Sequence, residues 1–268
     1  MSAERRARFR ELHAAGLFVM PNPWDVGSAK LLAWMGFHAL ATTSAGLAWS
    51  LGRLDQNVSR DELVAHVEVM AAATQLPLNV DSEHCFPDAP GGVAATVRML
   101  AEAGAAGCSI EDYDPAADRI IDIDTAAERV ALAAGAAPLV LTARAENHLH
   151  GVHDLDDTIA RIVAYRDAGA DVVYAPGLRD LASIGRVVAE AGIPVNVLGL
   201  PGGPTVLELA SVGVRRVSTG GALARAAYGA LLEGAAELRD RGTSSYSERG
   251  APADALGEAF ERGYTSAP

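Results

Sequence analysis

Acidic and basic side chains stand at the ends of three short apolar runs in this sequence. Asp81 and Glu83 follow the run that begins at residue 78, Glu111 ends the run 107–111, and Arg144 ends the run 139–144. A carboxylate next to or inside an apolar run costs free energy unless it is paired with a cation or bound to a metal. Several such groups meeting at one place therefore indicate a functional site.

The residue types predict a site for a hard divalent cation. Mg²⁺ takes oxygen ligands and keeps several waters, so one or two direct carboxylates, with others holding those waters, form the expected arrangement. Asp81, Glu83 and Glu111 supply such a set. Arg144 would neutralise a substrate carboxylate or stabilise a developing enolate. The structural alternative is that Arg144 pairs with Glu111 or Glu146 and ties the neighbouring strands together.

These residues lie on a repeating pattern of strand and helix. Short apolar runs bounded by turn residues alternate with longer amphipathic segments such as 60–74 and 155–168. Such alternation predicts a parallel sheet, and eight units in 268 residues favour a closed (β/α)8 TIM-type barrel over an open doubly wound sheet. After the first run, 20–25 lacks the G-x-G-x-x-G of a dinucleotide fold. The eight expected strands are 17–20, 38–43, 78–81, 107–111, 139–144, 172–175, 194–197 and 214–218.

The barrel explains why the acidic residues should meet. Active sites of (β/α)8 barrels lie at the carboxyl ends of the strands, so side chains that end different strands share one rim. We expect residues 1–241 to form the catalytic barrel. The polar stretch 242–250 predicts a linker and 253–262 a short amphipathic helix, so that 242–268 make a C-terminal extension.

Charge and composition exclude several classes of function. The formal net charge of −12 offers no basic surface for nucleic acid or anionic lipid. No stretch of about twenty residues is apolar throughout, and the N-terminus lacks the pattern of a signal peptide, so we expect neither membrane insertion nor secretion. Two cysteines, Cys85 and Cys108, make no disulfide framework. A cytoplasmic protein without nucleic-acid or membrane partners is the expectation.

Five short motifs, in order and at expected strand ends, resemble the isocitrate lyase and phosphoenolpyruvate mutase superfamily. The resemblance runs over nearly the whole barrel. It implies Mg²⁺, with Mn²⁺ as an alternative, and a small α-oxyacid substrate whose bonds are made or broken next to an enolate. The motifs are Asn22-Pro23-Trp24-Asp25-Val26-Gly27-Ser28-Ala29, Thr43-Ser44-Ala45-Gly46, Asp81-Ser82-Glu83, Ile110-Glu111-Asp112 and Ala143-Arg144-Ala145-Glu146-Asn147.

The resemblance assigns roles position by position. It makes Asp81 the direct metal ligand, with Glu83 and Glu111 in the metal shell, and Arg144 the cationic partner of the substrate. It also implies a mobile loop carrying the acidic Asp55 near the metal. The remaining substrate-binding positions that it implies are Trp24, Ser44, Ala45, Gly46 and Asn196.

Departures from the family pattern disfavour isocitrate lyase itself. The K-x-C-G-H lid after strand four, whose cysteine protonates the departing enolate, is replaced by 112–119, which contains neither cysteine nor lysine. The serines that follow the strand-seven asparagine in isocitrate lyases are absent after Asn196. The usual Gly-Tyr-Gly after the acidic pair is His84-Cys85-Phe86, and His84 becomes a candidate acid or base. His84 and Cys85 filling vacated space is the alternative. Three further histidines, His148, His150 and His153, suggest a metal cluster or, more simply, rim residues.

The sequence thus predicts a Mg²⁺-dependent carbon–carbon lyase or decarboxylase. Its substrate would be a small α-keto or α-hydroxy (di)carboxylate of oxaloacetate or alkylmalate type, reacting through a metal-bound enolate, with a metal-held water, Asp55 or His84 as proton donor. One alternative is phosphoenolpyruvate mutase or phosphonopyruvate hydrolase chemistry, weakened by the missing loop lysine. Another is a non-catalytic oxyacid-binding barrel. Class I aldolase chemistry needs a Schiff-base lysine, and the only lysine, Lys30, lies on the first helix.

The expected assembly is a homodimer or homotetramer. The resemblance implies that the last barrel helix is swapped between subunits, and the linker at 242–250 is compatible with that exchange.

Overall fold

Eight parallel strands form the sheet at the centre of the molecule, in a computed structural model that describes residues 2–262. Their order is β1-β10-β9-β8-β7-β4-β3-β2, and a hydrogen bond from Ala41 N to Pro21 O (3.1 Å) links the two ends, so the sheet closes as a (β/α)8 barrel. The predicted fold class is confirmed. The strands are β1 Phe18–Met20, β2 Leu40–Ala41, β3 Leu78–Asp81, β4 Gly107–Glu111, β7 Val140–Arg144, β8 Val172–Tyr174, β9 Val195–Leu198 and β10 Arg216–Ser218.

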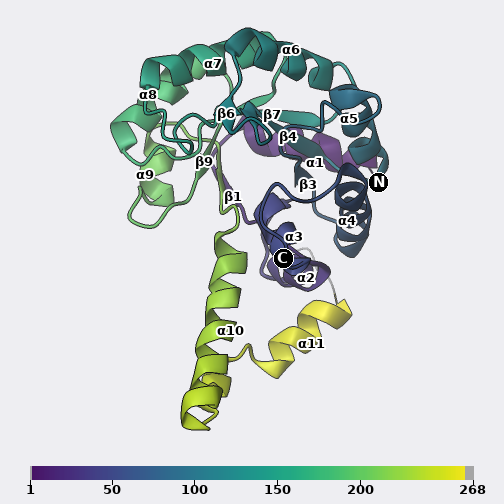
Figure 1. The fold of residues 1–268 in the computed structure, drawn as a ribbon, viewed down its shortest axis with the longest axis vertical. Helices are drawn as coiled ribbons and strands as arrows, with labels where there is room; N and C mark the ends of the chain where they lie inside the picture. Colours follow the sequence, from purple (N-terminus) through teal and green to yellow (C-terminus); the bar gives the residue numbers. More distant parts are fainter. Residues whose placement is uncertain (1, 263–268) are drawn as a thin grey trace.

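Helices follow the strands and cover the outside of the barrel (Figure 1). Their ends follow local sequence signals. Ser59 and Glu62 form a capping box that begins α4, and Gly169 takes a positive φ of 103° where the chain turns from α7 towards β8. These helices are α2 Val26–Trp34, α4 Arg60–Ala73, α5 Gly92–Glu102, α6 Ile123–Ala134, α7 Leu155–Asp167, α8 Leu181–Ala191 and α9 Val206–Ser211.

Helix α1 (Ser2–Ala14) closes the barrel at the amino ends of the strands. This helix was not predicted from the sequence. Phe9 is fully buried in a cluster with Phe18, Val140 and Val172. Arginines of α1 donate to backbone carbonyls beside the strands, as Arg6 does to Ala101 and Ala105. The charged N-terminal helix therefore covers this end of the barrel, with its apolar side chains packed against the strands and its arginines at the edge.

Two small elements modify the rim at the carboxyl ends. Helix α3 (Ser44–Ser50) follows β2 directly, with the Thr43 hydroxyl accepting from Gly46 N. The loop expected at 112–119 carries a short hairpin of β5 (Tyr113–Asp114) and β6 (Arg119–Ile120), in which the Tyr113 hydroxyl donates to Asp118 (2.8 Å). Both elements border the site described below.

The last barrel helix, α10 (Ala222–Arg241), leaves the barrel and extends away from it (Figure 1). The stretch predicted as a linker contains a 3-10 helix, η1 (Ser245–Arg249), and α11 (Ala253–Arg262) returns to pack on α2 with Ala259 buried. The predicted C-terminal helix is thus present. Residues 263–268 of the expected extension lie outside the described residues. Between residues 2 and 262, no helix is long and apolar enough to cross a membrane.

Candidate functional site

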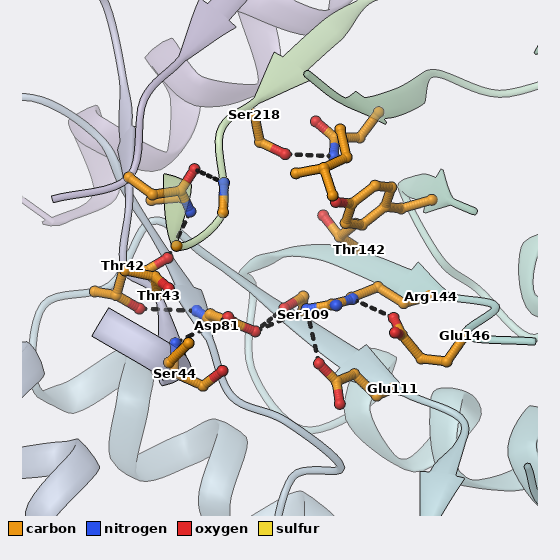
Figure 2. A pocket seen from close by; sticks show the side chains of 18 of the residues that line it. Thr42, Thr43, Ser44, Asp81, Ser109, Glu111, Thr142, Arg144, Glu146 and Ser218 are labelled. Carbon is orange, nitrogen blue, oxygen red and sulfur yellow. Dashed lines mark hydrogen bonds and ion pairs between the residues drawn. The ribbon is translucent and has the colours of Figure 1, made fainter. Parts of the chain in front are cut away.

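A cavity of about 350 Å³ opens at the carboxyl ends of the strands. Figure 2 shows Asp81, Glu111 and Arg144 pointing toward one another inside it, with Ser44 on one side and Glu146 on the other. Because β3, β4 and β7 are neighbours in the sheet, residues that end these strands come together although they are far apart in sequence. The prediction that these strand ends share one rim is confirmed for Asp81, Glu111 and Arg144.

Arg144 is the centre of this cluster. Its Nη1 lies 2.8 Å from Asp81 Oδ1 and 2.8 Å from Glu111 Oε1, and its Nε lies 2.6 Å from Glu146 Oε1. The ring of Tyr174 lies against the guanidinium, 5.1 Å from Cζ to the ring centre. The structural pairing considered from the sequence is therefore present. Among residues 2–262, no hydrogen bond is formed by Nη2, which leaves this nitrogen for a ligand.

The second carboxylate oxygen of Asp81 and that of Glu111 each accept a hydrogen bond from a different donor. Asp81 Oδ2 accepts from Ser44 N (3.0 Å), at the start of α3, and Glu111 Oε2 accepts from Gln56 Nε2 (3.3 Å). The loop 51–58 therefore carries Gln56 and its neighbour Asp55 over the cavity. These donors orient both carboxylates without neutralising them.

Negative charge exceeds positive charge at this rim. Burial, together with the nearby carboxylates Asp81 and Asp55, raises the pKa of Glu83 to about 8. Burial also raises the pKa of Glu111 well above its usual value, against the lowering effect of Arg144. The pKa of Arg144, which burial alone would lower, is raised well above its ordinary value by the surrounding carboxylates. Such a cluster favours a further cation.

The side chains present fit a hydrated Mg²⁺ better than a direct cage. Within residues 2–262, no three His, Cys, Asp or Glu side chains are close enough to hold a metal by themselves. Mg²⁺ usually keeps several waters and binds through one or two carboxylates. Gln56 Oε1 is buried without a hydrogen-bond partner among the described residues, as expected of an acceptor placed for a metal-held water. The carboxylate and amide oxygens at this rim suit a hard cation such as Mg²⁺.

A second layer of contacts fixes the rim from outside. Asp112 Oδ2 accepts from Arg161 Nη1 (3.0 Å) and from the Tyr165 hydroxyl (2.6 Å), while its Oδ1 accepts from Glu146 N (2.8 Å). All of these side chains are buried. The network holds the backbone of Glu146, and thereby its ion pair with Arg144, in one position.

The remaining predicted site residues divide into two groups. Ser44, Ala45, Asp55 and Asn196 line the cavity. Trp24, Gly46, Glu83 and His84 are not among its lining residues. A Cβ on Gly46 would lie 2.8 Å from Trp24 Cβ, so these two residues serve the close packing of α3 and the loop before α2. Glu83 is buried behind Asp81, with a positive φ of 50°.

The unusual His84-Cys85-Phe86 segment packs behind the rim. The His84 ring lies 5.5 Å from that of Phe86, and burial lowers the pKa of His84. Cys85 is fully buried and its thiol pKa is raised to about 12, so it stays protonated and unreactive. Neither side chain reaches the cavity, and neither takes part in the mechanism proposed below.

The three later histidines do not form a metal cluster in the described chain. His148 and His153 lie together, with ring centres 5.7 Å apart, beside another surface depression. His150 stacks on Tyr113 of the β5–β6 hairpin, 3.7 Å between ring centres, and both rings line the mouth of the cavity.

Several residues that line the cavity were not predicted from the sequence, among them Gln56, Tyr174 and Arg216. Gln56 follows Asp55 in a loop without periodicity, so nothing in the sequence marks it. Arg216 does carry a signal, because alternation along a strand puts it on the same face as Ser218. Both side chains line the cavity, whereas Val217 between them packs in the core beneath the helices.

The chain is similar to several known proteins. The family model described as phosphoenolpyruvate phosphomutase matches residues 9–239. A crystal structure of a candidate lyase/mutase from Burkholderia cenocepacia J2315 is 52% identical, with a TM-score of 0.92, and covers 97% of this chain and 96% of that one. Oxaloacetate decarboxylase 2 of Pseudomonas fluorescens (strain Pf0-1) is 31% identical over 201 residues, 72% of this chain and 68% of the relative.

A third similar protein is an oxaloacetate acetylhydrolase, solved in complex with its product oxalate. It is 26% identical, with a TM-score of 0.85, and covers 96% of this chain and 94% of that one. The family match spans most of the barrel and includes the strand ends that carry Asp81, Glu111 and Arg144. The chain therefore belongs to the phosphoenolpyruvate mutase and isocitrate lyase superfamily of enzymes.

Proposed function

We propose that this protein is a Mg²⁺-dependent carbon–carbon lyase or decarboxylase acting on a small α-keto or α-hydroxy dicarboxylate of oxaloacetate or alkylmalate type. The observation that carries the proposal is the position of Arg144 between Asp81 and Glu111, where all three side chains line one cavity. The similarity to an oxaloacetate decarboxylase and an oxaloacetate acetylhydrolase supports the substrate class.

Asp81 and Glu111 would hold Mg²⁺, directly or through water, and Gln56 and Asp55 would face its outer waters. When bound, the metal would act as a Lewis acid toward the α-oxygen of the substrate. Arg144 supplies the second positive charge, and its free edge can donate to a carboxylate or to the oxygen that gains charge as the bond breaks. Ser44 and Ala45 border the same space from the start of α3.

Proton transfer requires a group that is exposed to the bound substrate. His84 lies outside the cavity, whereas Asp55 lines its mouth. Of the two side chains predicted as proton donors, Asp55 is therefore the candidate that remains. The stacked rings of Tyr113 and His150 line the same cavity and would border a bound substrate.

The test is release of pyruvate or another 2-oxo acid from oxaloacetate and a series of 2-alkylmalates, with and without Mg²⁺. Spontaneous decay in Mg²⁺-containing buffer is subtracted. We expect turnover that depends on Mg²⁺. Asp81→Asn should lose both turnover and Mg²⁺ binding. The surface control Asp124→Asn should keep both. If none of these acids is turned over, the proposal fails, and phosphorus NMR with phosphonopyruvate then tests the phosphorus–carbon alternative.

We also propose that α10 is exchanged between subunits of a homodimer or homotetramer. The helix extends away from its own barrel and leaves Leu231 and Leu232 exposed, at 63% and 70% (Figure 1). A second copy would cover them. Light scattering after size exclusion should show a dimer or tetramer that Leu231→Asp weakens and the control Leu132→Asp, on α6, does not. A wild-type monomer at micromolar concentration would contradict the exchange.

A further inference from the structure

A second hollow, of about 600 Å³, lies beside the catalytic cavity. Its lining residues come from the segments that follow β7, β8 and β9, at the end of the barrel where (β/α)8 enzymes bind their substrates. Its size falls in the range of about 300–1,000 Å³ that is usual for small-molecule sites. We call this hollow the side pocket. It has no role in the reaction proposed above.

The side pocket and the catalytic cavity meet at Leu149, which lines both. The backbone N–H of Leu149 donates to Glu146 O (2.9 Å), so its position depends on a rim residue that pairs with Arg144. The loop after β8 approaches from the other side at Gly177, where φ is 96° and a Cβ would lie 3.2 Å from Leu149 N. Only glycine allows this approach without strain. The Leu149 side chain is 48% exposed, so the boundary between the two hollows is not a packed core.

Leucines give the side pocket an apolar wall. Leu155 begins α7, Leu178 follows β8 and is 8% exposed, and Leu200 follows β9. Leu198, two residues before Leu200, lines the catalytic cavity, so the segment that ends β9 borders both hollows. Apolar surface of this kind favours an apolar group over water.

The charged side chains of the side pocket do not call for an ionic ligand. Its lining residues include one basic and one acidic side chain, Arg179 and Asp180, whose formal charges cancel. Asp180 accepts from Ser183 N (2.8 Å) at the start of α8, and Arg179 Nη1 donates to Pro201 O (3.3 Å). Burial lowers the pKa of His148, so its imidazole is neutral at pH 7. The rim differs, because several carboxylates meet there.

We propose that the side pocket binds an alkyl chain carried by the α-carbon of the substrate, while the α-oxyacid end binds at the rim. The chain passes Leu149 and contacts Leu178 and Leu200. The inference rests on the proposed function and sharpens it, because it makes the preferred substrate an acid with an extended alkyl side chain rather than unsubstituted oxaloacetate.

Ligands that differ only in chain length test the side pocket. Lactate, 2-hydroxybutyrate, 2-hydroxyhexanoate and 2-hydroxyoctanoate share one metal-chelating end and lack the second carboxylate, so the proposed reaction does not consume them. Oxalate carries no chain and reports binding at the rim alone. Calorimetric titration with Mg²⁺ present measures each affinity. Burial of each CH₂ group should tighten binding by about two- to fourfold, so we expect at least about tenfold between 2-hydroxybutyrate and 2-hydroxyoctanoate.

Filling the side pocket should remove this gain. Leu200→Trp places an indole in it and should reduce the ratio of the two affinities to less than about threefold. The matched control is Leu207→Trp, on α9, where residue 207 is 83% exposed and does not line the side pocket; it should keep the full ratio. If Leu200→Trp does not fold, Ser183→Trp fills the pocket from the first turn of α8 and keeps the backbone N–H that caps the helix.

The outcomes separate the two proposals. Affinities that do not rise with chain length in the wild type, or a rise that survives in both Leu200→Trp and Ser183→Trp, would overturn the side pocket as the site of the chain. If neither oxalate nor any of the 2-hydroxy acids binds in a Mg²⁺-dependent way, the site at the rim is contradicted instead, and with it the proposed function.

Discussion

Two buried arginines, one layer apart inside the same barrel, have opposite surroundings. Arg144 at the rim touches three carboxylates, those of Asp81, Glu111 and Glu146. Arg216, one layer deeper, touches an amide, a hydroxyl and an imidazole. Carboxyl groups therefore outnumber cationic groups at the rim, whereas no Asp or Glu among residues 2–262 forms an ion pair with Arg216.

The difference means that the two layers favour ligand groups of opposite charge. An excess of carboxyl groups attracts a cation. An unpaired guanidinium attracts an anion directly.

Removal of the rim arginine should have the largest effect on activity. Arg144→Met keeps an unbranched side chain but removes the charge, and we expect kcat/KM to fall by about 10³-fold, the scale of losing a strong electrostatic donor at a reacting oxygen. Without its cation, the rim leaves Asp81, Glu111 and Glu146 unpaired and should lose about 3–5 kcal/mol of stability in metal-free buffer. Steady-state kinetics and urea unfolding measure the two effects.

Addition of Mg²⁺ distinguishes a charge effect from a general packing defect in the same variant. If the carboxylates lack a cation, Mg²⁺ should raise the melting temperature of Arg144→Met by more than it raises that of the wild type. Equal shifts in the two proteins would mean that the carboxylates do not form the metal site.

The base of the barrel should show the reverse pattern, in which stability changes and chemistry does not. Phe9 is fully buried between α1 and the strands, and its ring centre lies 6.0 Å from Arg216 Cζ and 4.9 Å from that of His13. Phe9→Ala should cost about 3–5 kcal/mol, measured by urea unfolding. At a temperature where the variant is folded, kcat/KM should stay within about threefold of wild type. Phe260→Ala, on the more exposed α11, is the control and should cost less.

How far the sequence predicts each region depends on the kind of signal that the region leaves. The rim was predictable because Asp81, Glu111 and Arg144 interrupt apolar runs at their ends, where a (β/α)8 barrel places its active site. The strands themselves fall within two residues of the predicted positions, because turn residues and apolar runs mark them independently. Domain limits within the chain stay a prediction.

The deeper layer of the cavity around Arg216 and the loop that carries Gln56 were not predictable in the same way. Arg216 lies on the same face of its strand as Ser218, but its lack of an acidic partner depends on the seven other barrel strands and on α1, which only the assembled barrel brings together. Gln56 reaches Glu111 from a loop that has no period. His84 is a counter-example: its chemistry and its place after the acidic pair suggested catalysis, yet the positive φ values of Glu83, Cys85 and Phe86 carry the chain behind the rim.

The smallest predicted effect concerns how the free energy of unfolding depends on pH through His13, which contacts Arg216. Burial and the adjacent Arg216 lower the pKa of His13 to about 3, from 6.5 in an exposed histidine. Between these two pH values His13 binds a proton in the unfolded chain but not in the folded protein. His13 therefore lowers the free energy of unfolding as the pH falls below 6.5, and it has no such effect above that pH. His66, with its pKa lowered to about 4, acts in the same direction.

Comparison with His13→Gln isolates the contribution of His13, because glutamine keeps an acceptor for Arg216 and cannot be protonated. Urea unfolding at pH 7 and at pH 5 should show that the variant loses about 2 kcal/mol less stability than the wild type over this interval. The exposed His153→Gln serves as the control and should follow the wild type. Parallel losses in wild type and His13→Gln would mean that the acceptor facing Arg216 carries a proton in the folded protein.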